Sequence, residues 1–408
     1  MQVCTSALSR SAPLRHATAD NRAVREKHND PRRDASFLPT PASEFLLSII
    51  GDAAHRRIFH TLDGLRGVAA LAVVVLHTSV MLAPIDLGSS YLAVDLFFMM
   101  SGIVIAHSYD HRLAADLSAR RFTAIRLIRL LPLYFVGFLG ATLVQILAQA
   151  TGTSHWDPAD LAIAWVSMAF MLPHIGGGPV VGLYPLNVPA WSLAWEIVSN
   201  VVYALLFKWW TPKVLAVGIA VAAVALVAVA VWYGDLDRGS QWAGWIGGPV
   251  RVGFGFTVGV WIERRRAQGR LIRISVPPVL LLALLLVVLA VPAAWGWPKD
   301  VAIVLLIFPL MCVAAIQSEG RGVRLFAFLG LISYPLYVTH AAFRYERMLP
   351  QFWHGAESAA PFSGIALITV MVAVAWILAR FVDVPVRQWL TRRWLGGAGP
   401  RPAQASAG

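Results

Sequence analysis

After Arg57 the chain consists mainly of long apolar runs joined by short connections. A run of about 20 apolar residues can cross the hydrocarbon layer of a bilayer as a helix. Charged residues make up 14% of the chain, against about 25% in soluble domains. The runs predict an all-α polytopic membrane protein. The candidate segments are 62–83, 91–108, 127–150, 159–172, 191–207, 213–233, 243–262, 276–292, 300–316, 325–343 and 363–383.

The first 57 residues have a different composition, because they are rich in arginine and proline and poor in apolar residues. Such a composition does not support a folded core. No apolar stretch follows the initiating methionine, so a secretory signal peptide is not expected. Next to a bilayer, a basic tail favours anionic lipid headgroups rather than nucleic acid as partners. We expect a disordered cytoplasmic tail at 1–57, a membrane domain at 58–391 and a second disordered cytoplasmic tail at 392–408.

The distribution of arginine predicts how the chain is oriented in the membrane. Arginines are concentrated in 110–130 and 263–275, whereas 84–90 and 151–190 contain no Lys or Arg. Cytoplasmic loops carry an excess of positive residues. We therefore expect the arginine-rich loops inside the cell, the other two outside, and the protein in the cytoplasmic (inner) membrane with both termini cytoplasmic.

This orientation requires that one of the apolar segments does not cross the membrane. An even number of crossings must separate the outer segment 151–158 from the inward-running segment 243–262, yet three candidates lie between them. Segment 159–172 is the shortest and is stopped by Pro173, so we interpret it as re-entrant or interfacial. This gives about ten transmembrane helices, with 151–190 as a candidate lid on the outer face.

The first apolar segment contains a charge and an imidazole, Arg66 and His77, which lie eleven residues apart. In a helix this spacing returns to within about 20° of the same face and spans about 16 Å. Ionisable groups inside a membrane are costly and usually functional. The structural alternative is an arginine that reaches the interface and a histidine bonded to a neighbouring carbonyl.

Three further charged residues within apolar segments are candidates for a function: Asp95, Glu196 and Arg251. Asp95 either caps its helix or has a functional role. Glu196 is expected one turn inside the start of its helix, where the dipole favours a carboxylate and a structural role is the alternative. Arg251 is expected near mid-membrane and needs an acidic partner. Glu196 is our first choice for that partner and Asp95 the alternative.

Two more pairs of residues are candidates for binding or chemistry. Arg126 and Arg129 are three residues apart in RLIRLLPLY, so they share a helical face at the inner entry of their helix and suit the binding of phosphate groups. The alternative is ordinary anchoring at the cytoplasmic surface. Tyr337 and His340 lie in SYPLYVTH, where a lone histidine on an apolar face is most often structural.

Five motifs in this order resemble the acyltransferase 3 family. They are LDGLRG with Arg66 preceding His77, VDLFFMMSG, the Arg126 and Arg129 pair in RLIRLLPLY, WSLAWE, and SYPLYVTH. The resemblance covers about 60–390. It implies about ten helices, a cytoplasmic acyl-CoA donor, acyl transfer to a hydroxyl of a sugar or related compound, and essential roles for Arg66 and His77.

The expected mechanism follows from the donor. Acyl-CoA is highly charged, so its phosphates would stay near Arg126 and Arg129 while its thin pantetheine arm reaches inward along the first helix to His77. The imidazole would then act as general base on the acceptor hydroxyl or become acylated itself. Asp95, Glu196, His340, Tyr337 and Arg251 are candidates for orienting the imidazole or binding the acceptor.

The expected partners are an acyl-CoA donor, a carbohydrate or glycoconjugate acceptor, and membrane lipids. Acetyl-CoA is the expected donor, and no permanently bound cofactor is expected. The cysteines Cys4 and Cys312 have no metal-binding spacing, so no metal site is expected. Two other functions are compatible with the sequence: a permease for a small solute or lipid-linked sugar, and a membrane scaffold or sensor.

Overall fold

The computed structural model describes residues 59–154, 156–176, 182–318, 322–343 and 355–396. Within these ranges every regular element is a helix and no strand forms. The all-α prediction is therefore confirmed for the described part of the chain.

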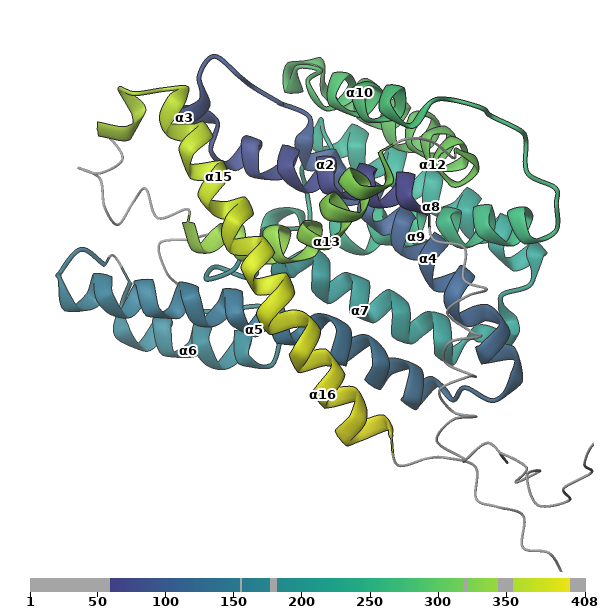
Figure 1. Ribbon diagram of the computed structural model, residues 1–408, viewed down its shortest axis with the longest axis horizontal. Coiled ribbons are helices and arrows are strands. Elements are labelled where there is room, and N and C mark those ends of the chain that lie inside the picture. The colour runs from purple at the N-terminus through teal and green to yellow at the C-terminus, as the bar shows by residue number, and fades with distance from the viewer. Residues whose placement is uncertain (1–58, 155, 177–181, 319–321, 344–354, 397–408) are drawn as a thin grey trace, which may run out of the picture. The chain divides into compact units, whose positions relative to one another are not determined.

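The helices follow one another with short connections (Figure 1). The longer elements are α2 (His60–His77), α4 (Ala93–Ala115), α5 (Ala119–Ala150), α6 (Pro158–Ala169), α7 (Ala190–Leu205), α8 (Pro212–Tyr233), α9 (Gly247–Ala267), α10 (Pro278–Leu289), α12 (Phe308–Gln317), α13 (Val323–Thr339), α15 (Phe362–Ile377) and α16 (Val384–Leu395). The shorter ones are α3 (Ser79–Leu82), α11 (Gly296–Ala302), and the single turns η1 (Ser90–Leu92), η2 (Phe207–Trp209), η3 (Trp242–Gly244), η4 (Ala293–Trp295), η5 (Ile303–Ile307), η6 (His340–Phe343) and η7 (Leu378–Asp383).

Six helical stretches of the described chain are long and apolar enough by themselves to cross a membrane. They are Ser90–Ala115, Ala119–Ala150, Pro212–Tyr233, Ala293–Gln317, Val323–Ala342 and Phe362–Leu395. These stretches make the chain an integral membrane protein, and the number of ten crossings stays a prediction.

The segment expected to be re-entrant or interfacial forms α6, which has 12 residues. At 1.5 Å per residue it is about 18 Å long, too short for a hydrocarbon layer of about 30 Å. Asp157 caps its start by accepting from the N–H groups of Ala159 and Asp160. The connection that follows is fixed to a second loop, because Leu183 donates its N–H to the carbonyl of Ser240 at 2.9 Å. Residues 177–181 of the expected lid lie outside the described part.

The first apolar segment is not one continuous helix over 62–83, as the sequence indicates. Helix α2 ends at His77, and α3 starts two residues later. At the break Thr78 has a non-helical backbone, and its hydroxyl donates to the carbonyl of Val74 at 2.8 Å. His77 is therefore the last residue of α2 and is followed by the non-helical Thr78.

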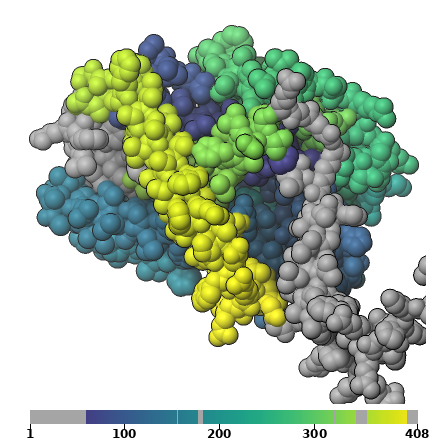
Figure 2. Space-filling view, viewed as in Figure 1, coloured from purple at the N-terminus to yellow at the C-terminus, as the bar shows by residue number. Residues whose placement is uncertain are grey.

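The last apolar segment is longer than predicted. Instead of ending at residue 383, the helix continues from α15 through the π-helical turn η7 into α16 and ends at Leu395. The first residues of the predicted tail at 392–408 are thus helical. Figure 2 shows the side chains of this long helix on the surface of the face in view. Its π-turn brings Asp383 to a buried position, with 4% of its surface exposed.

Glycines allow two helix pairs to approach closely. In the α4–α9 pair, a Cβ on Gly259 would lie 2.1 Å from the carbonyl oxygen of Met99. In the α2–α13 pair, a Cβ on Gly67 would lie 2.4 Å from the Cβ of Leu329, and one on Gly330 would lie 2.6 Å from the Cβ of Asp63. The second pair places α13 directly against the face of α2 that carries Arg66.

The close approach of α4 and α9 can be tested by one substitution at two places in α9. We expect Gly259→Ala to destabilise the protein by about 1–3 kcal/mol, because the added methyl group overlaps the backbone of α4. Gly253→Ala is the matched control, since a Cβ there has nothing within 4 Å and alanine favours a helix. The measurement is the thermal unfolding midpoint in detergent. Equal midpoints for the two variants would show that α4 and α9 do not approach this closely.

Candidate active site

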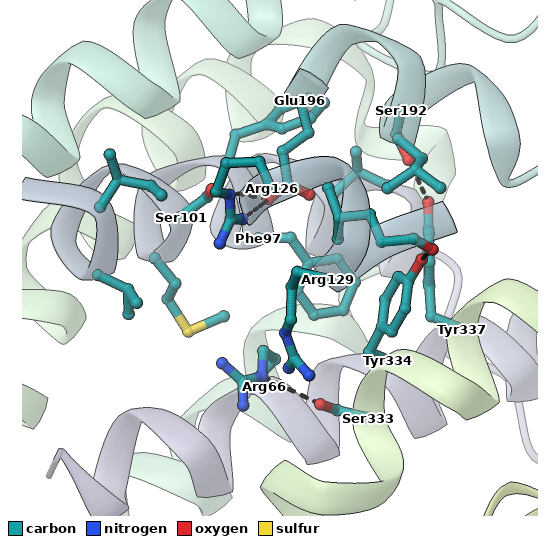
Figure 3. Close-up of a pocket in the computed structure, with 17 residues that line it drawn as sticks. Arg66, Phe97, Ser101, Arg126, Arg129, Ser192, Glu196, Ser333, Tyr334 and Tyr337 are labelled. Atoms are coloured by element: carbon teal, nitrogen blue, oxygen red, sulfur yellow. Dashed lines mark hydrogen bonds and ion pairs between the residues drawn. The ribbon is translucent and has the colours of Figure 1, made fainter. Parts of the chain in front are cut away.

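A pocket lies among α2, α4, α5, α7 and α13 (Figure 3). Its walls combine apolar side chains such as Phe97 and Phe98 with an unusual number of polar groups. The polar lining residues are Arg66, Ser101, Arg126, Arg129, Ser192, Glu196, Ser333, Tyr334 and Tyr337. Five of these, Arg66, Arg126, Arg129, Glu196 and Tyr337, were singled out in the sequence, and the structure brings them together.

Arg66 reaches the pocket from α2 and is held by residues of two helices. Its Nη2 atom lies 2.8 Å from a carboxylate oxygen of Asp63, one turn earlier. Its Nε atom donates to the hydroxyl of Ser333 on α13 at 3.0 Å. The close α2–α13 contact at Gly330 makes this second bond possible. The guanidinium is thereby fixed and directed into the pocket (Figure 3).

Arg126 and Glu196 form an ion pair inside the pocket, with Nη2 of the arginine 3.2 Å from Oε1 of the glutamate. Ser101 donates its hydroxyl to the same oxygen at 2.9 Å. One sequence expectation is wrong here. Arg126 is not at the entry of its helix, because α5 begins at Ala119 and the arginine lies about 10 Å farther in. Glu196 follows the start of α7 at Ala190 by more than one turn, so it lies inside the helix as expected.

Arg129 enters the pocket from the same face of α5 as Arg126. Its Nη1 atom lies 3.4 Å from a carboxylate oxygen of Asp383 in the π-turn η7. Arg387, in α16, binds the same oxygen at 3.2 Å. Sequence reasoning missed Asp383, although a lone carboxylate in an apolar run was a signal that pointed to it. The shared face of the two arginines, predicted from their spacing, is present.

The three pocket arginines can bind an anion in addition to their acidic partners. A guanidinium has five N–H donors, whereas the contacts of Arg126 and Arg129 with carboxylates use one terminal nitrogen each. Figure 3 shows the side chains of Arg66, Arg126 and Arg129 directed into the same space. Planar guanidinium groups suit carboxylate and phosphate oxygens. The pocket therefore offers N–H groups to an anionic ligand beyond those that bind the three carboxylates.

Tyr337 connects this pocket to the two histidines singled out in the sequence. It lines the pocket, and its hydroxyl lies 2.7 Å from that of Ser192. The centre of its ring is 6.0 Å from that of His340. The ring of His340 is in turn 5.0 Å from the ring of His77 and tilted by 25°. The structure thus places His77 and His340 together, next to the wall formed by Tyr337.

The partner of Arg251 is Asp95, so our first choice, Glu196, was wrong. The two side chains are 1% and 0% exposed, and Nη2 lies 2.6 Å from a carboxylate oxygen. Nε of Arg251 also bonds the carboxylate, at 3.0 Å. Asp95 does not cap its helix, because no side-chain cap bond is present at the start of α4. Neither residue lines the pocket, and the pair joins α4 to α9.

Further buried hydrogen bonds extend from the pair of Arg251 and Asp95 to neighbouring elements. Arg251 also donates to the backbone carbonyls of Tyr91 and Arg238, each at 2.8 Å. The hydroxyl of Tyr91 donates to Asp300 at 2.8 Å. These bonds join the starts of α4 and α9 to the loop after α8 and to α11. In the described ranges, no three His, Cys, Asp or Glu side chains are grouped so that they could hold a metal ion.

The buried ion pair makes a prediction that separates its two candidate partners. Asp95→Asn should destabilise the protein by about 3–5 kcal/mol, because it leaves a buried guanidinium without its counter-charge. Glu196→Gln should cost much less, since its carboxylate is partly exposed. The thermal unfolding midpoints in detergent measure both. A loss with Glu196→Gln that exceeded the loss with Asp95→Asn would reinstate the pairing first chosen from the sequence.

Comparisons with known proteins identify the family of the chain. A family model described as an acyltransferase domain, that of the acyltransferase 3 family, matches residues 59–380. A protein described as "Protein 2 in picA locus" from Rhizobium radiobacter is 38% identical over 181 residues, which cover 42% of this chain and 94% of that protein. No solved structure matches the chain. Because the family model spans most of the sequence, the chain belongs to the acyltransferase 3 family and is a membrane acyltransferase.

Proposed function

We propose that the protein is an O-acyltransferase that moves an acyl group from cytoplasmic acyl-CoA to a hydroxyl of a cell-envelope or exported polysaccharide. The observation that carries the proposal is the group of three arginines, Arg66, Arg126 and Arg129, in one pocket of an acyltransferase. The phosphates of coenzyme A are the anionic groups that such a pocket suits. Acetyl-CoA is the donor we would test first, and no permanently bound cofactor is required.

The proposed reaction places the donor along α2. The nucleotide phosphates bind at the arginines, and the pantetheine arm passes Tyr337 toward His77. Arg66 and His77 are about 16 Å apart along the helix, a distance that an extended pantetheine arm covers. In this arrangement the highly charged end of the donor never has to cross the membrane. The acceptor hydroxyl would reach His77 from the outer side, in the orientation proposed from the arginine-rich loops.

His77 is the proposed catalytic residue, with two possible routes. As general base it takes the proton of the acceptor hydroxyl while the oxygen attacks the thioester. As nucleophile it first accepts the acyl group itself and then passes it on. Membership of an acyltransferase family favours either route over the permease that the sequence alone left open. Mass spectrometry of surface and secreted glycans, with and without the gene, would identify the acceptor by a mass difference of one acyl group.

For the donor site we expect Arg126→Ala and Arg129→Ala to raise the KM for acetyl-CoA with little change in kcat, because they bind groups far from the reacting bond. Each lost contact should cost about 1.5–3 kcal/mol. Arg120→Ala is the control, since Arg120 lies on the same helix but is exposed. The assay follows radiolabelled acetyl-CoA with protein in nanodiscs. An unchanged KM in a folded double variant would remove the arginines from the donor site.

For the chemistry we expect His77→Ala to abolish acyl transfer while acetyl-CoA binding, measured by equilibrium dialysis, is kept. Loss of a general base typically lowers the rate by about 10²–10⁴-fold. A loss within that range favours the base route, and a complete loss fits an acylated imidazole. His111→Ala, at an exposed position on α4, controls for the substitution. Full activity of His77→Ala would contradict the proposal.

A further inference from the structure

His340 is bonded at both ring nitrogens to groups that can be identified. The residue begins the turn η6 directly after α13 and is 1% exposed. Its Nδ1 atom lies 2.7 Å from the backbone carbonyl oxygen of Tyr337. Its Nε2 atom lies 3.1 Å from Nδ1 of His77. The two imidazoles and the carbonyl thus form a continuous chain of hydrogen bonds from α13 to the end of α2.

The end of α13 explains why this carbonyl accepts a bond from a side chain. The last four carbonyls of a helix have no α-helical partner. Here the carbonyl of Leu336 accepts the backbone N–H of His340, and that of Val338 accepts the side-chain amide of Asn187 at 3.1 Å. The carbonyl of Tyr337, between them, accepts the imidazole. The helix end therefore sets the orientation of the His340 ring.

The position of each proton along this chain follows from what the atoms can donate. A carbonyl oxygen only accepts, so Nδ1 of His340 must carry a hydrogen. A neutral imidazole has one N–H, which leaves the lone pair of His340 on Nε2. That lone pair accepts a hydrogen bond, and the atom facing it is Nδ1 of His77. Nδ1 of His77 is then the donor, and the lone pair of the neutral ring is on Nε2.

We infer that His340 is a positioning residue that holds His77 in the Nδ1–H tautomer, so that Nε2 of His77 is the atom that takes part in acyl transfer. With both rings neutral, the tautomer follows from the hydrogen bonds. Its use in acyl transfer depends on the proposed function, which gives the chemistry to His77. Fixing a catalytic imidazole through its second nitrogen is a device that other enzymes use with a carboxylate. Here a second imidazole, anchored on a carbonyl, takes that place.

The transfer step balances with this assignment. Nε2 of His77 takes the proton of the acceptor hydroxyl, and the oxygen forms a bond to the acyl carbon. The bond between that carbon and the sulfur of coenzyme A breaks, and the sulfur leaves with the electron pair. The proton on Nε2 then passes to the thiolate, so that the products are the ester and free coenzyme A. Throughout, Nδ1–H of His77 stays bonded to His340, which stabilises the transient imidazolium.

His340 itself is a poor candidate for the base. Its Nδ1 carries a proton that the carbonyl of Tyr337 holds, and its Nε2 lone pair faces His77 rather than the pocket. It is also fully buried, whereas His77 is partly exposed. Its place in the chain of hydrogen bonds gives it an effect on His77 that does not require contact with the substrate.

The tautomer can be tested without any assay of activity. In protein labelled with ¹⁵N on histidine, the side-chain shifts distinguish a protonated ring nitrogen from one with a lone pair. The signals of His77 are assigned by their loss in His77→Ala. We expect His77 of the wild-type protein to be protonated on Nδ1, and to change to the Nε2–H form, which free histidine prefers in water, in His340→Met. An Nε2–H form in the wild-type protein would overturn the inference.

Kinetics test whether the tautomer matters for transfer. His340→Gln keeps an acceptor near the place of Nε2 and should recover most of kcat. His340→Met has a similar length but no comparable acceptor, and it should lower kcat by about 10²-fold, the lower end of the range for a general base, with KM for acetyl-CoA unchanged. His111→Met, at an exposed position on α4, is the matched control.

The outcomes separate the inference from the proposed function. Equal kcat values for His340→Gln and His340→Met would show that an acceptor at this position has no role. If the wild-type protein did not use acyl-CoA at all, the proposed function would fail, while the ¹⁵N spectrum would still decide the tautomer. The spectrum of the wild-type protein needs no variant at His340, so the inference stays testable even if both substitutions prevent folding.

Discussion

Charged side chains among apolar helices must find partners inside the protein, and this requirement determines much of the arrangement described above. The desolvation of an ion costs several kcal/mol, which only a close counter-charge and further hydrogen bonds offset. Arg251 illustrates this with Asp95, two backbone carbonyls and almost no exposed surface. The pair ties α9 to α4 where glycines bring the two helices together. The pocket lies beside this pair of helices, with four of its polar groups also in ion pairs.

The second arrangement that the site depends on is the contact between α2 and α13. Gly67 and Gly330 allow the backbones of α2 and α13 to approach closely. This approach brings two pairs of side chains into contact. Near the start of α2, Arg66 meets Ser333; at its end, His77 meets His340. The same two helices therefore hold both the arginine that faces the pocket and the imidazole pair. This one contact between α2 and α13 would hold the proposed phosphate-binding and acyl-transfer ends of the site at a fixed distance from each other.

The sequence predicted the fold class and the four charged residues that line the pocket, because ionisable groups are rare in membrane helices and stand out there. The predictions were wrong where the position of a residue along its helix decides which partner it contacts. Glu196 and Asp95 both follow a helix start that was predicted to be on the outer side, and only the α4–α9 contact shows which of them reaches Arg251. Asp383 was missed because it is the last residue of the predicted segment, whereas the helix continues through a π-turn and buries it. Ser101, Ser192 and Ser333 gave no signal, since serines are common in such helices.

The account has one central claim, that the donor binds with its phosphates at the three arginines and its reacting carbon at His77. A cryo-electron microscopy structure with a non-cleavable thioether analogue of acetyl-CoA would test it most directly. The account predicts nucleotide phosphates in contact with Arg66, Arg126 or Arg129, the chain passing Tyr337, and the acyl carbon close enough to Nε2 of His77 to leave room for one hydroxyl oxygen between them, about 3–3.5 Å from the carbon. A nucleotide bound elsewhere, or an acyl group directed away from His77, would contradict it.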